Sequence, residues 1–156
     1  MDNHKKFMTK AIDLANKNIQ NGGGPFGAVI VRNNEVVGSG ANQVTNFNDP
    51  TAHAEILAIR DASKNLNTYN LNDCILYTSC EPCPMCLGAI YWAHITKIYY
   101  GNSRHDAAEI GFDDDFIYKE ISTPNEKRSI LMQPLLSNQA ISTFKQWANM
   151  PQKKEY

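Results

Sequence analysis

A chain of 156 residues with 42% hydrophobic and 20% charged residues can bury one core, and this composition excludes disordered and fibrous classes. The formal net charge is −1 and no long run of Lys or Arg occurs, which disfavours a nucleic-acid partner because such binding needs concentrated positive charge. The first residues carry no apolar segment behind their charges, and no stretch reaches the ~18 apolar residues of a membrane span, so we expect a cytoplasmic protein that acts on a small neutral molecule.

Apolar periodicity and turn residues predict one domain of alternating helices and strands, without an internal repeat or a linker. In chain order we expect a helix over 7–19, strands at 28–31 and from 36, a helix over 53–66, a strand at 74–78, a helix over 84–93, strands at 95–100 and 130–132, and a helix over 140–150.

The connections predict how these strands pair. Asn33-Asn34 is typical of a hairpin turn, so the first two strands should be antiparallel. From residue 74 onward strands alternate with helices, which favours parallel pairing and helices on both faces of the sheet. Residues 41–52 and 113–115 are rich in polar and turn residues and are expected to form loops.

Three of the four cysteines lie within seven residues, which in a reducing compartment indicates a metal site before disulfides. Cys83 and Cys86 form a C-x-x-C pair in the first turn of a predicted helix, where the helix dipole and a zinc ion both favour thiolates. His53 from another element would complete three ligands. Three protein ligands leave the fourth tetrahedral position for water, as in catalytic zinc sites, so we expect one zinc ion per chain.

A carboxylate beside such a site would accept the proton of the water. Glu55 is the candidate, two residues after His53. Side chains at i and i+2 point to different sides of a regular helix, so both can reach one pocket only if His53 lies at the start of the helix. The preceding residues 49–51, Asp-Pro-Thr, are compatible with a helix start there.

Other interpretations of these residues remain. A structural zinc site could use Cys80 as a fourth ligand together with His53, Cys83 and Cys86, but it would leave Glu55 without a role. A thioredoxin-like redox pair would not need the histidine. Cys74, in the middle of a predicted strand, is typical of a small core residue.

The order of these residues matches the H-x-E…P-C-x-x-C signature of zinc-dependent nucleobase deaminases. The chain resembles the cytidine deaminase-like superfamily and, within it, the family of bacterial guanine deaminases over nearly its whole length. The signature is common to the superfamily, whereas two later segments are more particular to guanine deaminases. The segments that carry the resemblance are 24–28, 48–55, 76–86, 107–120 and 153–156.

The resemblance implies a three-layer α/β/α fold around a mixed five-stranded sheet. It also implies a homodimer in which residues 137–156 of one subunit form a lid over the active site of the other. The implied reaction is the zinc-dependent hydrolysis of guanine to xanthine and ammonia in purine catabolism, with Glu55 carrying the proton from water to the purine ring.

The same resemblance assigns further site residues, each of which also has an ordinary structural interpretation. Asp114 would be a second catalytic carboxylate near the leaving amino group, and Asn42 would hydrogen-bond the purine edge. Without the resemblance Asp114 would be an exposed loop acid and Asn42 a turn residue. The remaining substrate-binding residues are Phe26, Ala54, Trp92 and Tyr156.

Rival functions differ in substrate or in class. A tRNA adenosine deaminase shares the motif but needs a cationic face for the anticodon stem. Guanosine and cytosine are alternative substrates, since the zinc motif does not separate them. A zinc-stabilised binding module without activity would have no use for Glu55.

Overall fold

The computed structural model describes residues 3–156 and contains two compact units, one ending at Ile117 and the other spanning Tyr118–Tyr156. The elements that belong to or begin in the first unit are α1 (Asn3–Gln20), β1 (Gly27–Arg32), β2 (Glu35–Ala41), α2 (Val44–Phe47), α3 (Ala54–Leu66), β3 (Ile75–Cys80), α4 (Pro84–Trp92), β4 (Lys97–Asn102), α5 (Arg104–Glu109) and α6 (Asp114–Ile121).

The first unit contains a mixed four-stranded sheet in the order β2-β1-β3-β4. β1 pairs antiparallel with β2 and with β3, whereas β3 and β4 are parallel, as the connections predict. The hairpin between β1 and β2 turns at Asn33 and Asn34, whose positive φ values of 51° and 62° suit a tight turn. The predicted fifth strand is wrong: residues 130–132 lie in the second unit and form no strand among the described residues.

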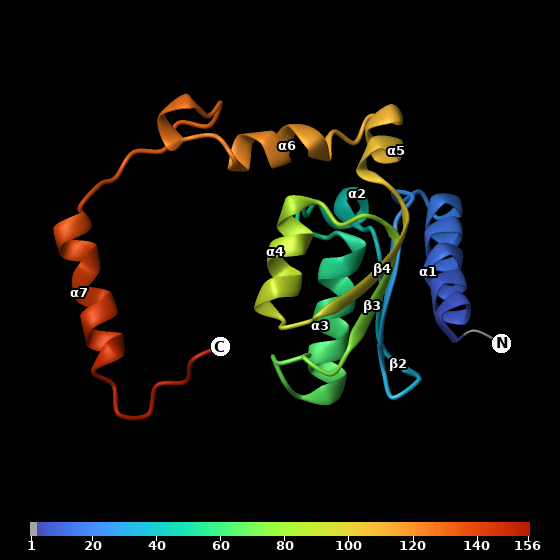
Figure 1. Ribbon diagram of the computed structural model, residues 1–156, viewed down its shortest axis with the longest axis horizontal. Helices are drawn as coiled ribbons and strands as arrows, with labels where there is room; N and C mark the ends of the chain where they lie inside the picture. The colour runs from blue at the N-terminus through green and yellow to red at the C-terminus, as the bar shows by residue number, and fades with distance from the viewer. Residues whose placement is uncertain (1–2) are drawn as a thin grey trace. The chain divides into compact units, whose positions relative to one another are not determined.

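Helices cover both faces of this sheet and complete a three-layer α/β/α arrangement (Figure 1). On one face Phe7 and Ala11 of α1 pack against Val29 and Tyr77. On the other face α3 and α4 bury a second cluster, to which Ile30 contributes from β1. The alternation of Val29 and Ile30 between the two clusters follows from the period of two residues along a strand.

Glycines allow α3 to lie directly on β2. A Cβ atom at Gly38 would press on the backbone of Ala58, and one at Gly40 would overlap the carbonyl oxygen of Ala54. No side chain therefore separates the first turn of α3 from the strand. This close backbone approach sets the position of the end of α3 that carries the functional residues.

Local hydrogen bonds form two short helices that periodicity could not predict. The N–H of Val44 binds the side chain of Asn42, so α2 interrupts the expected loop at 41–52. Ser103 and Asp106 form a reciprocal capping box at the start of α5. Asp114 and Asp115 are the first residues of α6 and do not lie in a loop, which corrects the expectation for them, whereas Asp113 precedes the helix.

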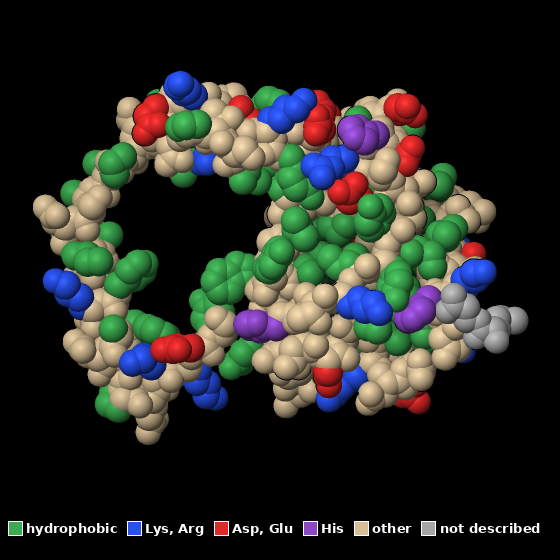
Figure 2. Space-filling view, in the orientation of Figure 1, with side chains coloured by type: hydrophobic (Ala, Val, Ile, Leu, Met, Phe, Trp, Pro, Cys, Tyr) green, Lys and Arg blue, Asp and Glu red, His purple; other side chains and the backbone are tan. Residues whose placement is uncertain are grey.

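The second unit contains the end of α6, a 3-10 turn (Asn125–Lys127) and α7 (Ser137–Ala148), which confirms the helix predicted at 140–150. The Arg128 guanidinium donates hydrogen bonds to the carbonyl oxygens of Glu120, Ile121 and Thr123 and so closes the turn. No residue from 118 to 156 is buried, and hydrophobic side chains lie on the surface of this segment (Figure 2). None of the helices described, here or in the first unit, is long and apolar enough to cross a membrane.

Candidate active site

The three predicted metal ligands lie at the first turns of two helices. His53 is the N-cap residue of α3 and Cys83 that of α4, both in extended backbone conformation, and Cys86 follows in the first turn of α4. An N-cap side chain is free of the regular helix and can point across its end. The expectation that His53 lies at the start of its helix is thus confirmed.

The spacing of the donor atoms fits one tetrahedral zinc ion. Nδ1 of His53 lies 3.5 Å from the sulfur of Cys83 and 3.5 Å from the sulfur of Cys86, and the ligand atoms all lie within 4.8 Å of one another. Zinc–sulfur and zinc–nitrogen bonds of about 2.3 and 2.05 Å at a tetrahedral angle separate nitrogen from sulfur by about 3.6 Å. Among the described residues this is the group that could hold a metal ion, and it leaves a fourth position open.

Hydrogen bonds among these donors perturb their titration in the metal-free chain. The Cys86 thiol, with help from His53, lowers the pKa of Cys83 to about 4. The same bond to Cys83 raises the pKa of Cys86, and the bond to Cys83 raises the pKa of His53. Zinc binding replaces these shared protons, because both sulfurs coordinate as thiolates.

Cys80 differs from the two ligand cysteines. Its thiol donates to the carbonyl oxygen of Ser103 at 3.8 Å, and burial raises its pKa to about 12. It does not belong to the group of donors that could share a metal ion. The geometry therefore favours a site of three ligands over a closed structural site. Burial raises the pKa of Cys74 to about 11, as suits a small core residue.

Glu55 lies in the first turn of α3, beside the metal ligands. Only 7% of it is exposed, and its Oε1 accepts a hydrogen bond from the Thr78 hydroxyl at 3.1 Å. Burial raises the pKa of this carboxyl. A raised pKa brings a carboxyl closer to the range in which it can both take and return a proton.

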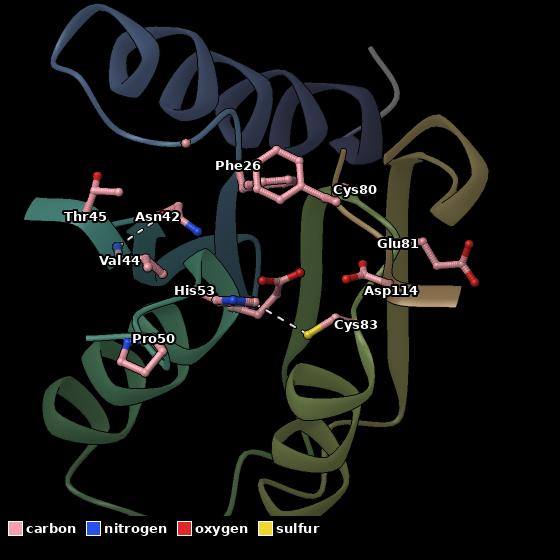
Figure 3. Close-up of a pocket in the computed structure, with 13 residues that line it drawn as sticks. Phe26, Asn42, Val44, Thr45, Pro50, His53, Cys80, Glu81, Cys83 and Asp114 are labelled. Atoms are coloured by element: carbon pink, nitrogen blue, oxygen red, sulfur yellow. Dashed lines mark hydrogen bonds between the residues drawn. The ribbon is translucent and has the colours of Figure 1, made fainter. Parts of the chain in front are cut away.

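A cavity of about 230 Å³ opens over these groups, smaller than the ~300–1,000 Å³ of pockets for drug-sized ligands. Six predicted site residues line this cavity, which Figure 3 shows in close-up: Phe26, Asn42, His53, Glu55, Cys83 and Asp114. The cavity is also lined by residues that the sequence analysis did not single out for the site: Gly24, Val44, Thr45, Pro50, Glu81 and Phe112, besides Cys80.

The orientation of the Asn42 amide follows from its backbone partner. Its Oδ1 accepts the N–H of Val44 at 3.1 Å, and a backbone N–H can only donate. The amide nitrogen is therefore the group that Asn42 can present to a ligand, and Figure 3 shows it directed toward the cavity. Asn18 of α1 holds this wall by donating to the carbonyl oxygens of Asn42 and Gly24, at 2.7 and 2.8 Å.

The opposite wall combines a carboxyl group with an aromatic pair. Asp114 is half-buried at the start of α6, and burial, followed by the nearby Cys83, raises its pKa. Phe112 packs edge-on against Phe26, with ring centroids 4.9 Å apart and planes at 85°. A planar ligand in the cavity would thus meet an aromatic ring, an amide donor and two carboxyl groups.

Three predicted substrate-binding residues are not among those that line the cavity. Ala54 is fully buried in the core. Trp92 ends α4 with 66% of its surface exposed, and Tyr156 lies in the second unit. Their roles toward a substrate stay predictions.

The fold and the site define a zinc-dependent deaminase. Residues 1–102 match the cytidine and deoxycytidylate deaminase zinc-binding region, and the chain belongs to this family. It is 54% identical to the guanine deaminase of Bacillus subtilis over 155 residues, 99% of each chain.

The crystal structure of the Bacillus subtilis guanine deaminase superposes with a TM-score of 0.95 over 98% of both chains. A guanine deaminase from Nitrosomonas europaea is 34% identical, with a TM-score of 0.66 over 69% of this chain and 63% of that one. The tRNA-specific adenosine deaminase of Haemophilus influenzae is 38% identical over 90% of this chain and 82% of that protein.

Proposed function

We propose that this protein hydrolyses guanine to xanthine and ammonia, in purine catabolism in the cytoplasm. The observation that carries the proposal is the buried carboxyl of Glu55 beside a three-donor zinc site, in a cavity of about 230 Å³. That volume suits a single base. The guanine deaminase of Bacillus subtilis, similar over nearly the whole chain, supports guanine as the substrate.

The residues around the cavity would divide the chemistry among them. Zinc, when bound by His53, Cys83 and Cys86, would supply a Lewis acid that lowers the pKa of water. Glu55 accepts the proton of the attacking water and delivers it to ring N3 of the base.

Asp114 would lie near the leaving amino group and ring N1, where it can hold the proton that leaves with ammonia. Asn42 donates to an acceptor on the purine edge, and Phe26 stacks on the ring. Ala54, Trp92 and Tyr156 complete the proposed set of substrate-binding residues.

Substrate selectivity provides the first test. We expect ammonia release from guanine. At equal concentrations, the rate of ammonia release from adenine or cytosine should be lower by about tenfold to a hundredfold or more. Asn42 presents a donor, so a base that offers an amino group there leaves a buried donor unpaired, at a cost of about 1–3 kcal/mol. The measurement is kcat/KM for guanine, adenine, cytosine and guanosine, with an anticodon stem-loop as a further substrate.

The stem-loop tests the alternative that this chain is a tRNA adenosine deaminase, like its relative from Haemophilus influenzae. A net charge of −1 does not favour a polyanion, so we expect no turnover of the stem-loop. Faster ammonia release from cytosine or from the stem-loop than from guanine would contradict the choice of substrate, while leaving the zinc mechanism intact.

We also propose that the protein forms a homodimer in which residues 137–156, ending in Tyr156, cover the active site of the partner subunit. The apolar side chains of α7 support this proposal. Ile141, Phe144 and Trp147 are 46%, 74% and 42% exposed, and an isolated helix of 12 residues is marginally stable in water. A covering segment would exclude water from the cavity and hold the base for attack.

Removal of residues 151–156 is expected to lower turnover strongly and to leave the thermal unfolding temperature nearly unchanged, because these residues are exposed and the buried core lies within the first unit. Mixing this truncated chain with full-length Glu55→Gln chains tests the exchange. In a swapped heterodimer the intact tail covers the intact Glu55 site, so part of the activity should return. If heterodimers form and no activity returns, the exchange between subunits is contradicted. The tail could then cover at most the active site of its own subunit.

A further inference from the structure

The Thr78 side chain is a polar group in the centre of the sheet. Thr78 is 1% exposed and follows Leu76 and Tyr77, which are 0% and 1% exposed, on β3. Its hydroxyl donates to Oε1 of Glu55 at 3.1 Å and lies 3.1 Å from the carbonyl oxygen of Cys80. One hydroxyl hydrogen thus faces two acceptors, and a carboxylate forms the stronger bond of the two.

This hydrogen bond joins the two elements that make the site. Glu55 stands on α3, next to the ligand His53, whereas Thr78 stands on β3, which leads through Cys80 to the ligand Cys83. Glu55 has rotatable bonds between its backbone and its carboxyl group, so its hydrogen-bond partners define where that group lies. Cys86 is a further partner of Glu55, but its sulfur belongs to the group that would bind zinc. Thr78 is β-branched and therefore stiff at χ1, so its hydroxyl is itself held in place.

We propose that Thr78 is a positioning residue for Glu55: its hydroxyl binds Oε1 and so keeps the other carboxylate oxygen directed into the cavity. The proposal rests on the proposed function only in treating Glu55 as the catalytic carboxylate. A displacement of about 1 Å of a reacting group can cost about a hundredfold in rate. Thr78 would act on the rate through Glu55, without touching the base.

Two substitutions separate the hydroxyl from the methyl group. Thr78→Val keeps the shape and removes the hydroxyl, and is expected to lower kcat by about tenfold to a hundredfold with KM changed less than about threefold. Thr78→Ser keeps the hydroxyl and should restore kcat to within about threefold of the wild type. Zinc content should stay at one per chain in both variants.

Ser79→Ala is the matched control. Ser79 is the next residue of β3, is 5% exposed, and its hydroxyl accepts the N–H of Gly27 at 3.0 Å. This variant also loses one buried hydrogen bond, so it should lose thermal stability to a similar extent. Because the Ser79 hydroxyl binds Gly27 and not Glu55, kcat should remain close to the wild-type value.

A crystal structure of the zinc-loaded Thr78→Val variant provides a readout that does not depend on the substrate. We expect the Glu55 carboxylate to leave its wild-type position there and to occupy it in Thr78→Ser. An unmoved carboxylate, wild-type kcat in Thr78→Val, or an equal loss in the Ser and Val variants would overturn the proposal. If the wild type released no ammonia from guanine, the proposed function would fail, and the carboxylate position would still decide the role of Thr78.

Discussion

Glu55→Gln is expected to lower kcat by about 10²–10⁴-fold or more, with zinc content and fold preserved. The amide has the shape of the carboxyl group but cannot accept a proton, and general acid–base catalysis typically contributes about this factor. The loss in kcat should exceed the lower end of this range, because Glu55 would both accept the proton of the water and donate it to the ring nitrogen. Ammonia release and metal analysis on the same preparation measure the two expectations.

Glu81→Gln provides the control for this substitution. Glu81 lines the same cavity, but its carboxylate accepts the backbone N–H of Arg104 at 2.9 Å and pairs with the guanidinium of that residue at 3.3 Å. Both carboxylate oxygens are thus held by Arg104, so the loss in kcat should be much smaller than for Glu55→Gln. Near wild-type turnover of Glu55→Gln would remove Glu55 from the mechanism.

Cys83→Ala is expected to remove most of the zinc and, with it, all measurable turnover. Only two protein donors, His53 and Cys86, would remain, which is one fewer than the three that hold a catalytic zinc ion. Metal analysis after dialysis against a weak chelator should show well below one zinc per chain, whereas the wild type retains it.

Cys80→Ala is the matched variant for the metal site. Cys80 lines the same cavity as Cys83, and its thiol donates a hydrogen bond to the Ser103 carbonyl oxygen, away from the metal-binding group. Zinc content should therefore stay at one per chain. Full occupancy in Cys83→Ala would refute the three-ligand site, and an equal loss in Cys80→Ala would indicate a closed site of four ligands.

The sequence predicted the part of the site in which chemistry follows from spacing along the chain. Cys83 and Cys86 are three residues apart on one turn, and the start of a helix is the place where His53 and Glu55 can both face the metal. Strand periodicity and the hairpin at Asn33 likewise predicted the pairing of the first strands. These features depend on local geometry, which neighbouring residues determine.

Features that depend on contacts distant in the sequence were not predictable in this way. Thr78 reads as an ordinary strand residue until the sheet brings it to Glu55, 23 positions away. Phe112 lines the cavity in contact with Phe26, which stands far earlier in the chain. The expected fifth strand came from the apolar residues 130–132, which signal burial in general but do not say against which partner. Resemblance to a family supplied Asp114 and Asn42, for which spacing alone offered ordinary alternatives.

The close approach of α3 to β2 has a consequence for the choice of metal. Since Gly38 and Gly40 let the helix rest on the strand backbone, His53 is held in place before any ion binds. Copper(II) binds nitrogen and sulfur donors more strongly than zinc does, and it prefers a square-planar arrangement. A square-planar ion would need neighbouring donors nearer together than the 3.5 Å that separates Nδ1 of His53 from the sulfurs of Cys83 and Cys86, whereas a tetrahedral ion fits this spacing. Two glycines that touch no metal contribute to this spacing, because they fix the start of the helix that carries His53.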